Sequence, residues 1–246
     1  MKSIYILLLS LLLMVSISWA EQNQHQMERF TKKVEISQPT TIKIINHYGD
    51  IRVRKADDDQ FIYHGVAQSQ VNQQVVLDFK QNKNQITATV KYSSLNKTNH
   101  LDRFDLALIV PEMVSLEIEI EGGNLTTKGL ASAIKVRTDD ANIQIKTSKA
   151  VDLFSKHGNI DLSIKPIDNK TKSTIQTHQG YVTVLYYVDM PRVEINTGKY
   201  VTSNSVPLLK SKSTQGRTHF YGDTNNNHYI KIKTDTGQIS LVDLAQ

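Results

Sequence analysis

Apolar and polar residues alternate in short runs along most of this chain, and polar turns that end in glycine join the runs. The stretch FSKHGNIDLSI, from Phe154 to Ile164, is one example, and RTDDANIQI, QTHQGYVTV, KSTQGRTHF and KTDTGQISL are close variants of it. Alternation with a period of two residues places successive side chains on opposite faces of a β-strand. Each phrase therefore predicts two short strands that meet at a glycine corner.

The corner residues recur at intervals of 17 to 22 residues. They are Gly123, Ala141 in place of a glycine, Gly158, Gly180, Gly198, Gly216 and Gly237. A nearly fixed period of this size is typical of stacked repeats. Eighteen residues at roughly 3.3 Å each span about 60 Å, enough for one coil whose strands pair in parallel with the next coil. The sequence therefore predicts an all-β fold, a parallel β-solenoid of about seven coils with a period of about 18–22 residues.

Two sets of positions face inward in this pattern. Apolar residues stand five and seven positions before each corner and two and four positions after it, and we expect them to share one core. Three positions before the corner the residue is usually small and polar, as in Thr138, Ser155, Thr177, Ser213 and Thr234. We expect their hydroxyl groups to hydrogen-bond to one another and to the corner backbone. A reactive serine is the alternative, but no histidine shares this column to activate one.

Residues 41–115 precede the main array of repeats at 116–246. The phrase INHYGDIRV fits the repeat around Gly49, and four further runs, QFIYHGVAQ, QQVVLDFK, QITATVKY and FDLALIVP, predict antiparallel strands. We expect this N-terminal strand region to cap the array, which otherwise exposes an open strand edge. Residues 21–40 form a polar segment, and residues 21–246 are expected to make one continuous body.

The first twenty residues, MKSIYILLLSLLLMVSISWA, predict a cleaved secretory signal peptide. They contain Lys2, an apolar run, and the small residues Ser18 and Ala20 at the positions that a signal peptidase reads. The run is too short for a spanning helix, which needs roughly 20 apolar residues, although a retained anchor is the alternative. We therefore expect an exported protein, in the periplasm or at the cell surface, with no transmembrane helix after cleavage.

Composition narrows the choice of partner. The chain has no cysteine, which excludes disulfides, thiolate metal sites and lipid attachment at a signal-adjacent cysteine. Its formal net charge is +5. In an exported protein this mild excess favours anionic envelope or extracellular polymers over nucleic acid, and a solvated surface is the simpler alternative.

A family resemblance adds to this interpretation. The run DLALIVPEMVSLEIEIEGGNLTTKGL, followed by the phrases GNIDL and GQISL behind a signal peptide, resembles the bacterial putative-adhesin domains, relatives of the head GIN domain. The similarity covers roughly residues 40–241 and depends on a loose pattern of glycine and β-branched residues. The resemblance implies an extracytoplasmic β-solenoid with an adhesin-like role. It implies no catalytic residues.

Outward-facing charges supply the candidate binding site. In the first repeats Glu117 and Glu119 are expected beside Lys135 and Arg137, and such pairs serve to hold the register. In the last two repeats Lys210 is expected beside Lys231, and Lys212 beside Lys233. Lysine on terminal strands discourages edge-to-edge aggregation. Alternatively the patch binds an anionic glycan or lipid head group through Lys199, Lys210, Lys212, Arg217, Lys231 and Lys233.

A protein partner is also expected at the C-terminal end. The last coil, residues 229–244, would leave a free parallel edge that another strand can extend. The alternative is that the C-terminal residues LVDLAQ, or a loop, cover that edge.

The runner-up function is a carbohydrate-active enzyme, because glycoside hydrolysis needs two carboxyl groups about 5–10 Å apart. Asp161 is expected beside Gln144 and Thr183, and Asp152 beside Arg137 and Gln176, so neither has an acidic neighbour. Asp139 and Asp140 are expected to pair with Lys156 and His157 at the next corner. The protein is therefore predicted to be non-catalytic.

No cofactor or metal site is predicted. His157 and His178 stand at neighbouring corners but lack a third zinc ligand. The acidic run at residues 57–59 lacks the alternating spacing of a calcium loop. Glycine-rich phosphate cradles are absent, because the glycine phrases open strands instead of helices.

Overall fold

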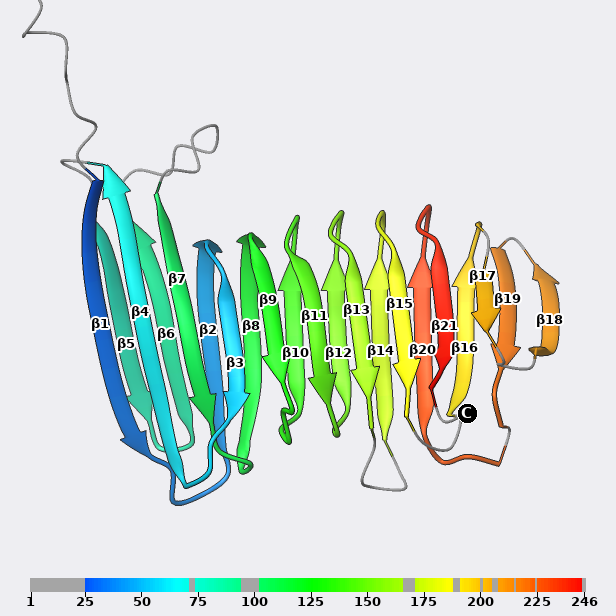
Figure 1. The fold of residues 1–246 in the computed structure, drawn as a ribbon, viewed down its shortest axis with the longest axis horizontal. Helices are drawn as coiled ribbons and strands as arrows, with labels where there is room; N and C mark the ends of the chain where they lie inside the picture. Colours follow the sequence, from blue (N-terminus) through cyan, green and yellow to red (C-terminus); the bar gives the residue numbers. More distant parts are fainter. Residues whose placement is uncertain are drawn as a thin grey trace, which may run out of the picture.

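The computed structural model describes residues 25–70, 74–93, 102–165, 171–187, 191–199, 201–204, 208–214, 216–223 and 225–244. Throughout these ranges the regular elements are β-strands (Figure 1). No described segment forms an apolar helix of the length that a bilayer crossing requires. The predicted signal peptide lies outside the described residues.

The strands form two sheets that run side by side along the long axis of the molecule (Figure 1). Sheet A has the order β1 (His25–Glu35), β4 (Gln60–Gln70), β7 (Arg103–Val110), β3 (Ile51–Lys55), β9 (Asn124–Lys128), β11 (Asn142–Thr147), β13 (Ile160–Ile164), β15 (Val182–Tyr186), β21 (Ile239–Asp243) and β17 (Val201–Asn204). Sheet B has the order β18 (Leu208–Thr214), β19 (Gly216–Tyr221), β16 (Arg192–Thr197), β20 (Tyr229–Thr234), β14 (Lys172–Thr177), β12 (Val151–Ser155), β10 (Ile134–Thr138), β8 (Val114–Gly122), β2 (Thr40–Tyr48), β6 (Gln85–Tyr92) and β5 (Val75–Asn82).

Successive repeats in the middle of the array pair in parallel and in register. In sheet A, Ile143 lies opposite Ile160, and Ile160 lies opposite Val182. In sheet B, β8, β10, β12 and β14 pair in the same way. The predicted all-β fold with parallel strands stacked by repeat is confirmed for this part of the chain.

One hydrophobic core fills the space between the sheets. It contains the predicted inward columns, including Leu116, Val136, Leu153, Ile175 and Ile232. These side chains are at most 1% exposed. A single repeat has too few apolar residues to enclose such a core, so each repeat is stabilised mainly by its neighbours.

The corner residues stack on one another's backbone. A Cβ atom added to Gly123 would lie 2.2 Å from the carbonyl oxygen of Gly49, and one added to Gly237 would lie 2.0 Å from that of Gly180. Gly123 also has a φ of +120°, where L-residues are strained. Glycine is needed at these corners because neighbouring rungs approach too closely for a side chain.

The inward hydroxyl groups before the corners bond to the corner backbone, as predicted. In Thr138, Ser155 and Thr234 the hydroxyl oxygen accepts a hydrogen bond from the N–H group three residues later, which closes the turn, whereas the Thr177 hydroxyl donates to the Gln179 carbonyl oxygen. The distances are 2.9 Å from Ala141 N to Thr138 Oγ1, 2.9 Å from Gly158 N to Ser155 Oγ and 2.8 Å from Gly237 N to Thr234 Oγ1.

The N-terminal strands include the predicted antiparallel pairs. β4 pairs antiparallel with β1 and with β7, and β5 pairs antiparallel with β6. β7 and β6 then pair in parallel with β3 and β2, the two strands of the repeat around Gly49. β1 lies in the segment that the sequence marks only as polar, and it forms the outer edge of sheet A.

The last repeat does not follow the preceding one in space. β20 lies between β14 and β16, and β21 lies between β15 and β17. Figure 1 shows these red and orange-red strands inserted beside the yellow ones. The predicted free edge at residues 229–244 is therefore wrong, because both strands of that coil are paired on both sides.

The predicted coil around Gly216 is also wrong. Gly216 begins β19, which runs antiparallel to both β18 and β16. A polar turn that ends in glycine suits a hairpin as well as a solenoid corner, since both need a residue without a Cβ atom. The array therefore does not consist of seven equivalent coils in sequence order.

Candidate functional site

The basic residues predicted to gather on the C-terminal repeats are separated in the structure. Lys210 lies opposite Phe220, and Lys212 lies opposite Thr218. Lys210 and Lys212 are on β18, and Lys231 and Lys233 are on β20, with β19 and β16 between the two strands. Three strand spacings place β18 and β20 about 14 Å apart. The expected pairs of like charges are therefore wrong. The side chains of Lys210, Lys212 and Arg217 lie outside the described residues.

The other members of this set have different surroundings. Lys231 Nζ lies 3.1 Å from Glu194 Oε1 and is therefore charge-paired. Lys233 lies between Gln176 and Asn196 on the adjacent strands. Lys199 is exposed at the corner that follows β16. β20 is an interior strand, so edge protection cannot explain its lysines, whereas β18 is the last strand of sheet B.

The outer face of sheet B carries several cations that are paired with acids, although Lys172 and Lys233 have no acidic partner among the described residues. Cross-strand ion pairs join five of its pairs of adjacent strands. They are Lys91 with Asp78 at 2.8 Å, Lys43 with Glu119 at 2.7 Å, Lys135 with Glu117 at 3.8 Å, Arg137 with Asp152 at 2.5 Å and Lys231 with Glu194 at 3.1 Å. The predicted register of Glu117 with Lys135 and of Glu119 with Arg137 is confirmed.

Two of these carboxyl groups show the effect of their partners. A hydrogen bond from the Tyr229 hydroxyl lowers the pKa of Glu194, and Lys231 lowers it further. A hydrogen bond from Lys91 lowers the pKa of Asp78. Burial, together with the same bond to Glu194, raises the pKa of Tyr229 to about 12. These carboxylates are stabilised in their charged form and act as partners for the cations beside them.

The outer face of sheet A carries a basic groove near its N-terminal end. We use this name for the hollow of about 320 Å³ over β4, β7, β3 and β9, whose outward residues are Arg52, Arg54, His64, Ala107, Ile109, Thr126 and Lys128. Arg52 lies between Ala107 and Thr126, and Arg54 lies between Ile109 and Lys128. The groove therefore has a row of cations beside a small apolar strip.

The cations of the basic groove have no acidic partner among the described residues. Arg52, Arg54 and Lys128 are all exposed, and none forms an ion pair or a side-chain hydrogen bond within the described parts of the chain. Arg54 and Lys128 stand directly opposite each other on adjacent strands, an arrangement that destabilises the sheet. β3 and β9 are interior strands, so protection of an edge does not account for them.

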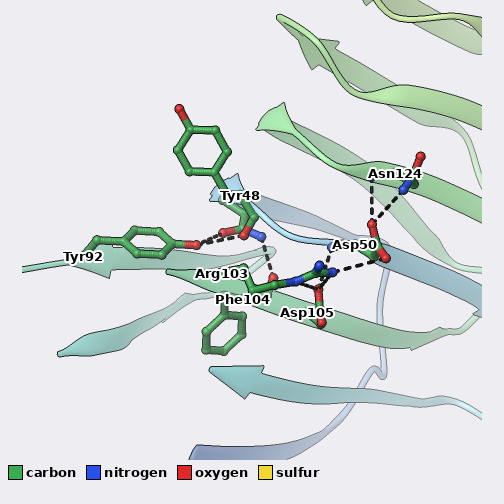
Figure 2. A network of polar contacts seen from close by, with 8 residues as sticks. Tyr48, Asp50, Tyr92, Arg103, Phe104, Asp105 and Asn124 are labelled. Carbon is green, nitrogen blue, oxygen red and sulfur yellow. Dashed lines mark hydrogen bonds and ion pairs between the residues drawn. The ribbon is translucent and has the colours of Figure 1, made fainter. Parts of the chain in front are cut away.

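A second hollow, of about 670 Å³, lies at the corner edge beside Tyr48, Gly49 and Gly123. Figure 2 shows the polar network next to it. Arg103 contacts Asp105 at 2.5 Å and Asp50 at 3.2 Å. Asp50 Oδ1 in turn accepts hydrogen bonds from Asn124 N at 3.1 Å and Nδ2 at 3.0 Å.

The same network reaches the N-terminal strands. The Tyr92 hydroxyl lies 2.7 Å from Asn46 Oδ1 and 3.0 Å from the Tyr48 carbonyl oxygen, and Asn46 Nδ2 donates to the Phe104 carbonyl at 2.8 Å (Figure 2). Its hydrogen bond to Asp105 raises the pKa of Arg103. These bonds connect β6, β2, β7 and β9, so the network holds the first rungs together.

The remaining acids of the corner hollow are paired with bases. Glu121 lies 2.8 Å from His47 Nδ1. The predicted pairs at the next corner are confirmed, with Asp139 at 2.7 Å from Lys156 and Asp140 at 2.7 Å from His157. Each of these three carboxylates therefore has a basic structural partner.

The two acids considered for catalysis are isolated from each other. Asp161 lies between Gln144 and Thr183, as predicted. Asp152 lies opposite Lys135 and Thr174 and bonds to Arg137. Its predicted neighbour Gln176 is two residues further along β14 than the observed neighbour, Thr174. Among the described residues no three histidine or acidic side chains are placed to hold a metal ion.

The basic groove was missed from the sequence although a signal was present. Arg52 and Arg54 stand three and five positions after Gly49, and Lys128 stands five positions after Gly123. Those are outward positions of the second strand of the repeat, and the two corners are stacked. A comparison of the outward positions after each corner, as well as before it, would have predicted that these cations are neighbours.

Comparison with known proteins supports the fold. No family model and no curated protein matches the chain. The solved structure of a "putative cell adhesion protein" from Clostridium sporogenes is similar over 89% of this chain and 100% of that one, with 15% identity and a TM-score of 0.54. A "putative adhesin" from Bacteroides fragilis (88% and 97% covered, 11% identity, TM-score 0.35) and a "putative lipid binding protein" from Parabacteroides distasonis (88% and 97%, 12%, 0.31) also match.

The resemblance to putative adhesins that the sequence suggested is thus confirmed at the level of the fold. At 15% identity the likeness to the Clostridium protein shows the fold alone.

Proposed function

We propose that this chain is an exported, non-catalytic, adhesin-like protein that binds an anionic polymer of the cell envelope or surface. The observation that carries the proposal is a cluster of unpaired cations on sheet A. Arg52, Arg54 and Lys128 lie on adjacent strands with no acidic partner among the described residues, whereas the neighbouring cations Lys43, Lys135 and Arg137 of sheet B are each paired with an acid. Unpaired cations on a rigid sheet attract polyanions without the cost of breaking internal ion pairs.

We also propose the finer organisation of the chain. Residues 1–20 act as a signal peptide, residues 41–115 cap the array, and residues 116–246 form the β-solenoid. The parallel registers from β8 to β15 support the solenoid, and the antiparallel pairs of β1, β4 and β5 support the cap. The inserted last repeat is then an internal rung, and the strands at the C-terminal end are β17 and β18.

The proposal of a non-catalytic role is supported by the ion pairs that the carboxylates form. Asp139, Asp140, Glu121 and Asp152 each bond to a basic side chain. Cross-strand ion pairs of this kind hold the register of neighbouring rungs, which accounts for these carboxylates without a catalytic role.

Retention on anionic polymers, together with cell fractionation, tests this function. The purified protein should be retained on immobilised heparin or lipopolysaccharide at low salt and released as the salt concentration rises. The tagged full-length protein should fractionate with the periplasm or cell surface. A reducing-end assay across envelope and plant glycans should show no turnover. Turnover that is lost in Asp161→Asn or Asp152→Asn, or a lack of retention on both polymers, would contradict the proposal.

A further inference from the structure

The basic groove has features that point to one class of anionic ligand. We propose that it binds a linear acidic polysaccharide, which crosses the strands of sheet A from β4 towards β15. This inference rests on the proposed function and adds the place and the chemistry of binding. It is carried by the positions of four cations, a nearby aromatic ring and the polar side chains between them.

The cations lie within reach of one continuous ligand. Arg54 and Lys128 are on adjacent strands, about 4.8 Å apart, and Arg52 is about 6.6 Å from Arg54 along β3. Lys146 continues the series on β11, the strand that follows β9. Guanidinium groups form paired hydrogen bonds with carboxylate and sulfate oxygens, which suits two arginines to an acidic sugar.

An aromatic side chain lies further along the same face. The Lys146 ammonium group lies 5.7 Å from the centre of the Tyr187 ring, and Tyr187 is 38% exposed at the end of β15. A tyrosine ring offers an apolar face together with a polar edge, which matches the C–H face and the hydroxyl groups of a pyranose ring. The cationic part of the groove is thus followed by a surface for uncharged parts of a glycan.

A ligand that contacts both the groove and Tyr187 has to be long. β4 and β15 are six strand spacings apart in sheet A, which corresponds to about 29 Å. A chain of several sugar units can extend over this distance, but a single phosphate or lipid head group cannot. Thr126, Gln144 and Thr183 share one row along the path and provide hydroxyl and amide groups for hydrogen bonds.

A membrane surface fits the groove less well than a glycan. Insertion into lipid needs large exposed apolar side chains. None of the large, well exposed apolar residues of the described structure lines the groove, and of them Tyr187 lies further along the proposed path. They are Met27, Val76, Met113, Tyr181, Tyr187, Leu208, Leu209 and Leu244. The apolar strip of the groove consists of Ala107 and the partly buried Ile109.

One acidic residue lies on the path, and changing it tests whether the ligand is negatively charged. Asp161 is exposed in the row between Gln144 and Thr183. A polyanion that follows this row passes close to the carboxylate, and the two repel each other. Asp161→Asn should therefore strengthen binding of a long acidic glycan about twofold to threefold.

The decisive experiment compares two triple variants with the same change in net charge. The first, Arg52→Gln, Arg54→Gln and Lys128→Gln, removes the unpaired cations of the groove. The second, the sheet B control, changes Lys43, Lys135 and Arg137 to glutamine and removes paired cations. Affinities for heparin and polygalacturonate are measured by calorimetry at several salt concentrations, with thermal unfolding as the check on folding.

The groove variant should lose at least tenfold in affinity for both polysaccharides and should show a weaker dependence on salt. The sheet B control should change the affinity by less than about twofold. Tyr187→Ala should weaken binding of an octasaccharide about threefold and leave a disaccharide unaffected. If the groove variant binds as tightly as the wild type while the wild type is retained on the polymers, this inference is wrong and the proposed function stands.

Other outcomes are equally decisive. Equal affinity of the wild type for the disaccharide and the octasaccharide would rule out the extended path. Binding to vesicles that contain phosphatidylglycerol, without binding to either polysaccharide, would assign the groove to a membrane surface and overturn the inference. A wild-type protein that binds none of these probes would overturn the proposed function itself.

Discussion

The two sheets of this protein share one core and one backbone pattern, yet their outer faces are built differently. On sheet B, Lys43, Lys135 and Arg137 each bond to a carboxylate of a neighbouring rung. On sheet A, Arg52 and Arg54 lie on an interior strand without such a partner in the described structure. Stacking places equivalent residues of successive repeats side by side, so the choice of residue at a single outward position decides whether charges are paired or accumulate.

The difference also has an energetic side. Exposed ion pairs contribute about 0.2–1 kcal/mol each, and like charges in register cost a similar amount. Sheet B therefore uses its charges to hold register, while sheet A accepts a small loss of stability around Arg54 and Lys128. A loss of this kind without structural compensation is typical of binding surfaces.

The largest expected effect comes from breaking the stacked corner, on which the register of both faces depends. Gly123→Ala places a Cβ atom 2.2 Å from the Gly49 carbonyl oxygen at a φ of +120°. We expect a loss of more than about 2 kcal/mol in the free energy of unfolding, measured by urea denaturation. Gly129→Ala is the matched control, because Gly129 has a φ of +59° but no atom near the added carbon. Equal losses in the two variants would contradict the role of stacking.

The next prediction tests whether the pairing of cations with acids is what makes the outer faces of the two sheets differ in polyanion binding. Glu117→Gln, Glu119→Gln and Asp152→Asn together free three cations on sheet B. We expect retention on heparin to increase several-fold, because the freed cations no longer have internal partners. Elution salt concentration measures the change.

A matched control for this triple variant has the same net charge. Glu35→Gln, Asp57→Asn and Asp59→Asn remove three acids outside the sheet B ion pairs. Their effect on retention should be clearly smaller. If both triple variants raise retention equally, net charge decides binding and local pairing does not.

A smaller effect is expected from giving a sheet A cation an acidic cross-strand partner, as the cations of sheet B have. Thr126 lies opposite Arg52, so Thr126→Glu places a carboxylate beside that guanidinium. We expect about 0.2–1 kcal/mol of added stability, together with weaker retention on heparin. Thr126→Gln introduces a side chain of nearly the same size as glutamate without the charge, so it should weaken retention clearly less than Thr126→Glu. Equal behaviour of the two variants would show that Arg52 is not part of the binding surface.

The smallest effect concerns the response of sheet B to acid. The hydrogen bond from Tyr229 lowers the pKa of Glu194 from its ordinary value of 4.5, so the carboxylate stabilises the fold at neutral pH. This stabilisation is lost as the pH falls below 4.5 and passes through the lower pKa of the folded state. The melting temperature of the wild type should therefore fall more steeply below that pH than that of Glu194→Gln. Parallel curves for the two proteins would contradict the assignment.

Much of the fold could be predicted from local pattern. Alternation around Ile143 and Ile160 identified the strands, and the spacing of their corners identified the parallel register. The hydroxyl groups of Thr138 and Ser155, and the pair of Lys156 with Asp139, followed from the same alignment. These features depend on a residue and its counterpart in the next repeat, which the sequence displays directly.

The site could not be found by the same route. The lysines at the C-terminal end were predicted to be adjacent because their repeats follow one another in the sequence, yet β19 and β16 separate Lys210 from Lys231. Conversely, Arg54 and Lys128 are 74 residues apart and lie side by side. Charge clustering depends on which rungs are neighbours, and only the middle of the array keeps the order of the sequence.

Local pattern along the chain specified the class of structure, most of the strands, the inward and outward positions, and glycine at the corners. These follow from the period of two along a strand and from the steric size of a Cβ atom. Only the tertiary structure decided the order of the rungs at the C-terminal end. Every repeat has a similar apolar face and the same backbone hydrogen-bonding groups, so β20 and β21 can pair with several rungs, and the contacts of the whole stack select the place between β14 and β16.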